Sequence, residues 1–145
     1  MITIKGNKIK GEGAASHTIP LQFSTIVNGY REILNCFKGT ININLEKDLY
    51  ILNPDYKTQP IKWHPAMQVG EIFDFLKIKL FLPRLNKEFD AWIYVAHHSP
   101  HRKKLNFHEV LCEKIDDLRV DEKLELKITK HHYSLDYLPN IIFIG

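Results

Sequence analysis

The stretch Gly39-Thr40-Ile41-Asn42-Ile43-Asn44-Leu45 carries the clearest structural pattern in the chain and decides our prediction of the fold. Apolar and small polar residues alternate along it, which is the period of a β-strand with one buried face. The apolar residues expected to face a core are Ile41, Ile43 and Leu45. The polar residues expected to form a row of neutral oxygen groups on the opposite face are Thr40, Asn42 and Asn44.

Further strands are expected where apolar residues alternate or where β-branched and aromatic residues gather. They cover residues 2–6, 72–82, 91–96, 108–115, 124–128 and 140–144, with a hairpin turn at residues 85–88. Helical spacing of apolar residues predicts one helix over residues 20–37, although Gly29 lies inside it. Because strands far outnumber helices, we predict a mainly β fold, a small barrel rather than a parallel doubly wound sheet.

The composition is that of one globular domain covering residues 1–145, with 44% hydrophobic and 26% charged residues. The net charge of +3 is too small to imply nucleic-acid binding by itself. No apolar run reaches the roughly 20 residues of a membrane helix, and no signal-peptide pattern is present, so we expect a cytoplasmic protein without a membrane segment. Cys36 and Cys112 lack a CxxC spacing and are expected to be buried free thiols.

Two short motifs suggest a phosphate site. Gly11-Glu12-Gly13 follows the first expected strand, and glycines let backbone N–H groups approach phosphate oxygens closely. Thr40 and Asn42 share a strand face and can both reach a Mg²⁺ ion that also holds triphosphate oxygens. The structural alternative is a turn glycine beside a solvated strand face.

The order of these motifs resembles that of the archaeal CTP-dependent riboflavin kinases. That family has a Gly-x-Gly-Glu-Gly loop, a helix and then a Gly-Thr-Leu-Asn-Leu strand. The matching residues here are Gly6, Gly11-Glu12-Gly13 and Gly39-Thr40-Ile41-Asn42-Ile43. The resemblance extends over about residues 6–128. Here, however, the loop before Gly11 is shorter, and the family's short helix near the C-terminus has no clear equivalent.

The resemblance implies a six-stranded cradle-loop barrel that transfers the γ-phosphoryl group of CTP to riboflavin, giving CDP and FMN. It implies nucleotide phosphates over Lys10, Gly11, Glu12 and Gly13. It implies Mg²⁺ held by Thr40 and Asn42. Substrate contacts are implied for His98, Ser99 and Glu109. A dedicated catalytic base is not essential, because such transfer depends mainly on positioning and charge neutralisation.

Two other interpretations stay open. The chain could be a non-catalytic nucleotide- or nucleic-acid-binding module on the same barrel, in which residues 101–104 contact phosphates. It could instead be a metal enzyme built on the cluster of His97, His98, His101 and His108. His97 and His101 could share a face there, although no convincing third and fourth zinc ligands accompany these two. Most of the large aromatic residues are expected in the core rather than stacked on a ligand: Trp63, Trp92, Tyr94 and Phe107.

Overall fold

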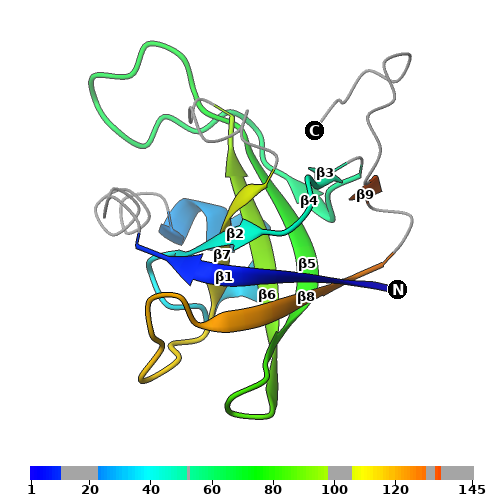
Figure 1. The fold of residues 1–145 in the computed structure, drawn as a ribbon. Helices are drawn as coiled ribbons and strands as arrows, with labels where there is room; N and C mark the ends of the chain where they lie inside the picture. The colour runs from blue at the N-terminus through cyan, green and yellow to red at the C-terminus, as the bar shows by residue number, and fades with distance from the viewer. Residues whose placement is uncertain (11–22, 52, 98–105, 130–132, 135–145) are drawn as a thin grey trace.

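The computed structural model describes residues 1–10, 23–51, 53–97, 106–129 and 133–134 (Figure 1). The strands are β1 (Ile2–Ile9), β2 (Ile41–Leu45), β3 (Tyr50–Ile51), β4 (Tyr56–Lys57), β5 (Phe73–Leu82), β6 (Lys87–Ala96), β7 (Phe107–Cys112), β8 (Lys123–Ile128) and β9 (Tyr133–Ser134). Residues 23–29 are helical, and a 3-10 turn, η1 (Arg31–Ile33), follows them.

Six antiparallel strands close into a barrel in the order β5-β6-β7-β2-β1-β8, with β8 returning to β5. The closure is possible because β5 is ten residues long. Its first half pairs with β4 through Phe75, and its second half pairs with β8 through Leu80, on the same edge. The prediction of a mainly β fold with a six-stranded barrel and one helix is therefore confirmed.

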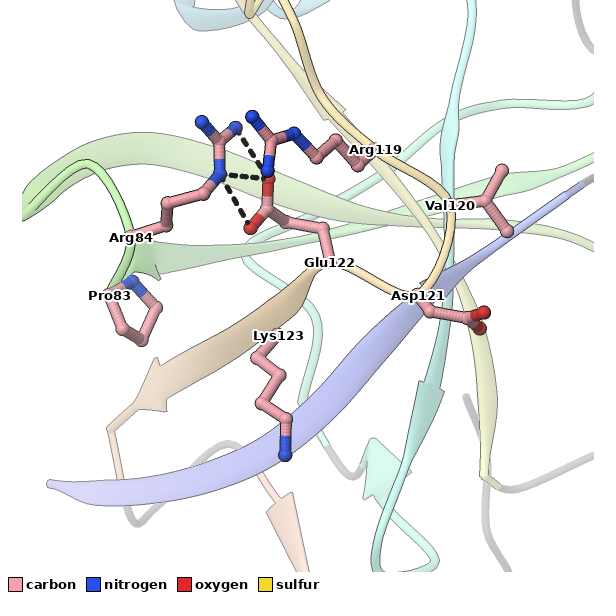
Figure 2. A pocket seen from close by; sticks show the side chains of 7 residues that line it. All are labelled: Pro83, Arg84, Arg119, Val120, Asp121, Glu122 and Lys123. Atoms are coloured by element: carbon pink, nitrogen blue, oxygen red, sulfur yellow. Dashed lines mark hydrogen bonds and ion pairs between the residues drawn. The ribbon is translucent and has the colours of Figure 1, made fainter.

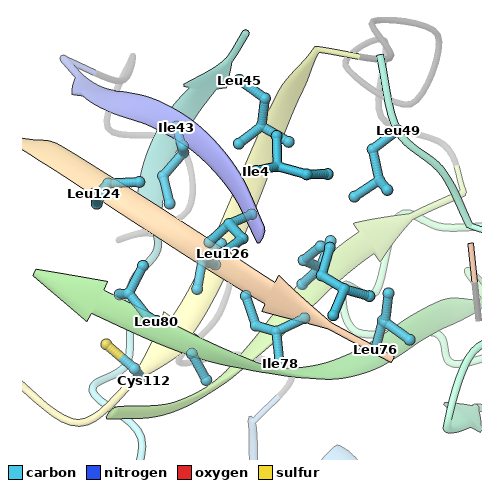
Figure 3. Packing of buried hydrophobic residues seen from close by; sticks show 14 of the residues in the cluster. Ile4, Ile43, Leu45, Leu49, Leu76, Ile78, Leu80, Cys112, Leu124 and Leu126 are labelled. Carbon is cyan, nitrogen blue, oxygen red and sulfur yellow. The ribbon is translucent and has the colours of Figure 1, made fainter. Parts of the chain in front are cut away.

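The barrel interior is filled by the apolar side chains that alternate along every barrel strand (Figure 3). Leu126 of β8 lies opposite Ile4 of β1 on one side and opposite Leu80 of β5 on the other. Ile43 of β2 is completely buried in the same cluster, as its alternation predicted. Each such side chain contributes about 1.5–3 kcal/mol by leaving water, so this core stabilises the barrel.

A second apolar cluster lies outside the barrel, where residues 23–29 and η1 cover the outer face of β5, β6 and β7. Trp92 and Tyr94 of β6 are buried in it, as expected for core aromatics. The indole N–H of Trp92 donates to the Tyr30 hydroxyl at 3.2 Å. The helical segment therefore shields one part of the barrel wall from water.

Several element boundaries differ from those predicted. β1 continues to Ile9 instead of ending near Gly6, because β2 and β8 pair with it from both sides. The helix ends at Gly29 rather than continuing to residue 37. A Cβ at Gly29 would lie 2.4 Å from the Tyr56 hydroxyl, so glycine permits this close contact between the helix end and β4. β7 ends at Cys112, and the strand expected at residues 140–144 lies outside the described residues.

In the described part of the chain, no helix has the length and apolar character needed to span a membrane. Cys36 and Cys112 are buried free thiols, which confirms the prediction made for them.

Candidate functional site

One row of paired residues crosses four strands and brings two of the predicted site residues together. Asn42 of β2 lies opposite Ile9 of β1 and, on its other side, opposite Glu109 of β7. Glu109 in turn lies opposite Tyr94 of β6. The residue predicted to bind metal and a residue predicted to contact substrate are therefore direct neighbours, although they are 67 positions apart in the chain.

Strand alternation turns this row toward the outside of the barrel. Ile43 and Val110, the next residues along β2 and β7, are completely buried in the barrel core. Asn42 and Glu109 must therefore point the opposite way, because successive side chains of a strand face opposite sides. Both are half-buried rather than fully exposed.

Thr40 lies just before β2 and shares the outward face of Asn42. Its hydroxyl donates a hydrogen bond to the amide oxygen Oδ1 of Asn42, with 3.5 Å between the two oxygens. Neighbouring oxygen ligands of an octahedral Mg²⁺ ion, each at about 2.1 Å from it, lie about 3.0 Å apart, so the two oxygens would have to approach each other by about half an ångström to share one ion. Asn44 continues the polar face but is exposed and lies opposite Phe107, away from Glu109.

Glu109 is the electrostatically unusual member of the site. Burial raises the pKa of its carboxyl above the ordinary value, because a charged carboxylate is poorly solvated there. Within the described residues, no cation forms an ion pair with this carboxylate. A positively charged group of a ligand, or a Mg²⁺ ion, would therefore stabilise the charged form of the Glu109 carboxylate.

Lys10 directly follows Ile9, the β1 partner of Asn42, and is exposed. The structure thus places a described nucleotide-binding candidate at the same edge of the barrel as Asn42. The rest of that candidate loop, Gly11, Glu12 and Gly13, lies outside the described residues, as do the substrate candidates His98 and Ser99.

A buried Asp–His pair was missed by the sequence reasoning. Asp74 of β5 is almost fully buried, and its Oδ2 lies 2.8 Å from Nε2 of His97, the first residue after β6. The Nζ of Lys57 lies 3.7 Å from the other carboxylate oxygen. The available signal was a charged residue inside the apolar run Phe73–Leu76.

The histidine cluster is only partly described. His97 contacts Asp74, and His108 is buried on β7 in the inward alternation of Val110. His98 and His101 lie outside the described residues. Among the residues with described positions, no three His, Cys, Asp or Glu side chains gather as a metal site.

Neither a scan against protein-family models nor a search of curated proteins gives a match for this chain. The geometry of the Asn42–Glu109 pair is therefore the basis on which a function can be assigned.

Proposed function

We propose that the chain is a Mg²⁺-dependent nucleotide phosphotransferase that resembles the CTP-dependent riboflavin kinases. The observation that carries the proposal is the pairing of Asn42 with Glu109 on the outward face of the barrel. Sequence resemblance assigned these two residues separately, one to the metal and one to the substrate. Their adjacency supports a single site in which both reactants meet.

Thr40 and Asn42 fit a magnesium site in their chemistry. Both offer neutral oxygens, which suit a hard cation, and the two oxygens are 3.5 Å apart. Bound Mg²⁺ would neutralise charge on the triphosphate. Because two neutral ligands hold the ion weakly by themselves, the nucleotide must supply further oxygens, and metal and nucleotide should bind together.

Glu109 is the residue that we assign to the phosphoryl acceptor. Its carboxylate can accept a hydrogen bond from an acceptor hydroxyl and so orient that hydroxyl toward the phosphate. Burial raises the pKa of Glu109, which makes it a better proton acceptor than an exposed carboxylate. Lys10, which directly follows Ile9, the β1 partner of Asn42, would add a positive charge for phosphate oxygens.

The proposal is tested by incubating purified protein with Mg²⁺, riboflavin and each of the four nucleoside triphosphates in turn. FMN is separated from riboflavin by chromatography and detected by its fluorescence. We expect FMN with at least one nucleotide and loss of FMN formation when Mg²⁺ is chelated. No FMN with any nucleotide, together with no thermal shift from Mg²⁺ and CTP, would remove the proposal.

Two asparagine variants sharpen the test. Asn42→Ala removes a metal oxygen and is expected to reduce phosphoryl transfer by about 100-fold. Asn44→Ala is the matched control, because Asn44 belongs to the same strand and face but lies opposite Phe107. The control is expected to keep activity within about twofold of the wild type. Equal losses in both variants would speak against a magnesium site at Asn42.

A further inference from the structure

A hollow of about 360 Å³ lies between the β5–β6 turn and the loop that leads into β8 (Figure 2). Pro83 and Arg84 line it from the turn, and residues 119–123 line it from the loop. Its lining shares no residue with the outward-facing site at Asn42. Glu122 at its base is buried and directly precedes β8, on the inward alternation of Leu124.

Arg84 is held in one orientation within this hollow. Its Nε lies 2.9 and 3.1 Å from the two carboxylate oxygens of Glu122, and its Nη2 lies 2.7 Å from Oε1. The same Nη2 donates to the backbone carbonyl of Asp117 at 2.9 Å. This leaves Nη1 as the part of the guanidinium that no described residue engages.

Arg119 supplies a second guanidinium at the same place. Figure 2 shows its side chain beside Arg84, with both guanidinium groups next to the Glu122 carboxylate. Among the described residues, none forms a hydrogen bond or ion pair with the Arg119 guanidinium, and the residue is exposed. The Asp121 side chain, the other acidic group of the lining, points away from the two arginines (Figure 2).

The lining holds three positive side chains, Arg84, Arg119 and Lys123, and two negative ones, Asp121 and Glu122, and the Asp117 carboxylate interacts with Arg84 from outside the lining. The two arginines share the Glu122 carboxylate. Glu122 neutralises only one of them, and the hydrogen bonds from Arg84 hold the pKa of Glu122 below its ordinary value, so it stays charged. A guanidinium that is already oriented loses little conformational freedom when a ligand binds. Its planar fork of N–H donors matches the oxygens of a phosphate group.

We propose that Arg84 and Arg119 form a binding site for the phosphate group of a phosphate ester. A tetrahedral dianion has enough oxygens to accept from Nη1 of Arg84 and from the Arg119 guanidinium at the same time. This site uses none of the residues proposed to bind magnesium or the acceptor.

The test is a titration of the full ¹⁵N-labelled chain with inorganic phosphate at low ionic strength, followed through the arginine Nε–H resonances. We expect saturable shifts at Arg84 and Arg119. Arg119→Gln is expected to weaken binding about tenfold, the effect of losing one charge-assisted hydrogen bond. The variant should keep the fold, because no described residue forms a hydrogen bond or ion pair with the Arg119 guanidinium.

Arg31→Gln is the matched control, because Arg31 is an exposed arginine of η1, outside the hollow. It removes the same charge and is expected to change phosphate affinity by less than about twofold. Equal weakening in the two variants would mean attraction by net charge alone and would overturn the site. Equally strong shifts with acetate would overturn its assignment to phosphate.

Discussion

The guanidinium of Arg84 in the β5–β6 turn binds the carboxylate of Glu122, directly before β8, through N–O distances of 2.7–3.1 Å. The pair joins two segments that are 38 positions apart, next to the place where β8 closes the barrel on β5. The loop before β8 is also joined to β1, because the Lys8 N–H donates to the Glu122 carbonyl at 2.9 Å. The pair therefore lies where three segments of the barrel meet.

Stability should depend on this pair in a pH-dependent way. The hydrogen bonds from Arg84 lower the pKa of Glu122 in the folded state, so the folded protein releases this proton more readily than the unfolded chain. The contribution is present above the unfolded glutamate pKa, about 4.3, and is lost as the pH falls through the lower folded value. Thermal unfolding between pH 3 and pH 7 should show Glu122→Gln with a lower Tm at pH 7 and a smaller difference at pH 3. A difference independent of pH would contradict this linkage.

For Glu109 we expect the opposite effect of pH on stability: its charged form destabilises the folded protein. Burial raises its pKa, so the folded state binds this proton more tightly than the unfolded chain, and its charge destabilises the protein above about pH 4.3. Glu109→Gln should therefore be more stable than the wild type at pH 7, and the gain should shrink toward pH 4. Urea unfolding of both proteins across this range measures the difference. A variant less stable than the wild type at pH 7 would contradict this, because it would mean that the surroundings stabilise the charged carboxylate.

The closure of the barrel depends on packing at Leu126. Leu126→Ala removes a completely buried side chain that lies between Ile4 and Leu80, and it should cost about 2–5 kcal/mol of unfolding free energy. The control is Glu125→Ala, one residue earlier on the outer face of β8, with an expected change within about 0.5 kcal/mol. Urea unfolding gives both values. Similar costs at the two positions would contradict the inward orientation of Leu126.

The buried Asp74 should contribute more to the unfolding free energy than an exposed acidic residue does. Asp74→Asn removes the negative charge that faces His97 and Lys57, and it should cost about 1–3 kcal/mol. Asp90→Asn is the control, because Asp90 pairs with Lys79 at an exposed position of β6 where an ion pair contributes little. Chemical unfolding compares the two. No loss in Asp74→Asn would show that the pair is dispensable for the fold.

The two cysteines should be unreactive in the folded protein. Burial raises the pKa of both Cys36 and Cys112 to about 12, so almost no thiolate forms at pH 8. A thiol reagent such as DTNB is expected to label the native chain slowly and the chain in denaturant at once. Rapid native labelling of either cysteine would mean that the second apolar cluster or the end of β7 opens readily.

The candidate site could be predicted only in part from the sequence, because some of its features depend on neighbouring residues and others on residues far apart in the chain. Alternation at Thr40–Leu45 is a local property, so the polar face that carries Thr40 and Asn42 could be read from neighbouring residues. The pairing of Asn42 with Glu109 depends on the register of two distant strands. Resemblance named both residues, but alternation alone could not place them together.

By itself, the sequence predicted the six barrel strands and, where apolar and polar residues alternate, the side that faces the core, because a period of two depends only on adjacent residues. It did not predict the short strands β3, β4 and β9. It also determined that strands would outnumber helices, and hence the mainly β barrel. Only the tertiary structure decided which long-range partners meet: Arg84 with Glu122, Asp74 with His97 and Asn42 with Glu109. Those contacts arise from barrel closure and strand register, which are set by packing among all six strands at once.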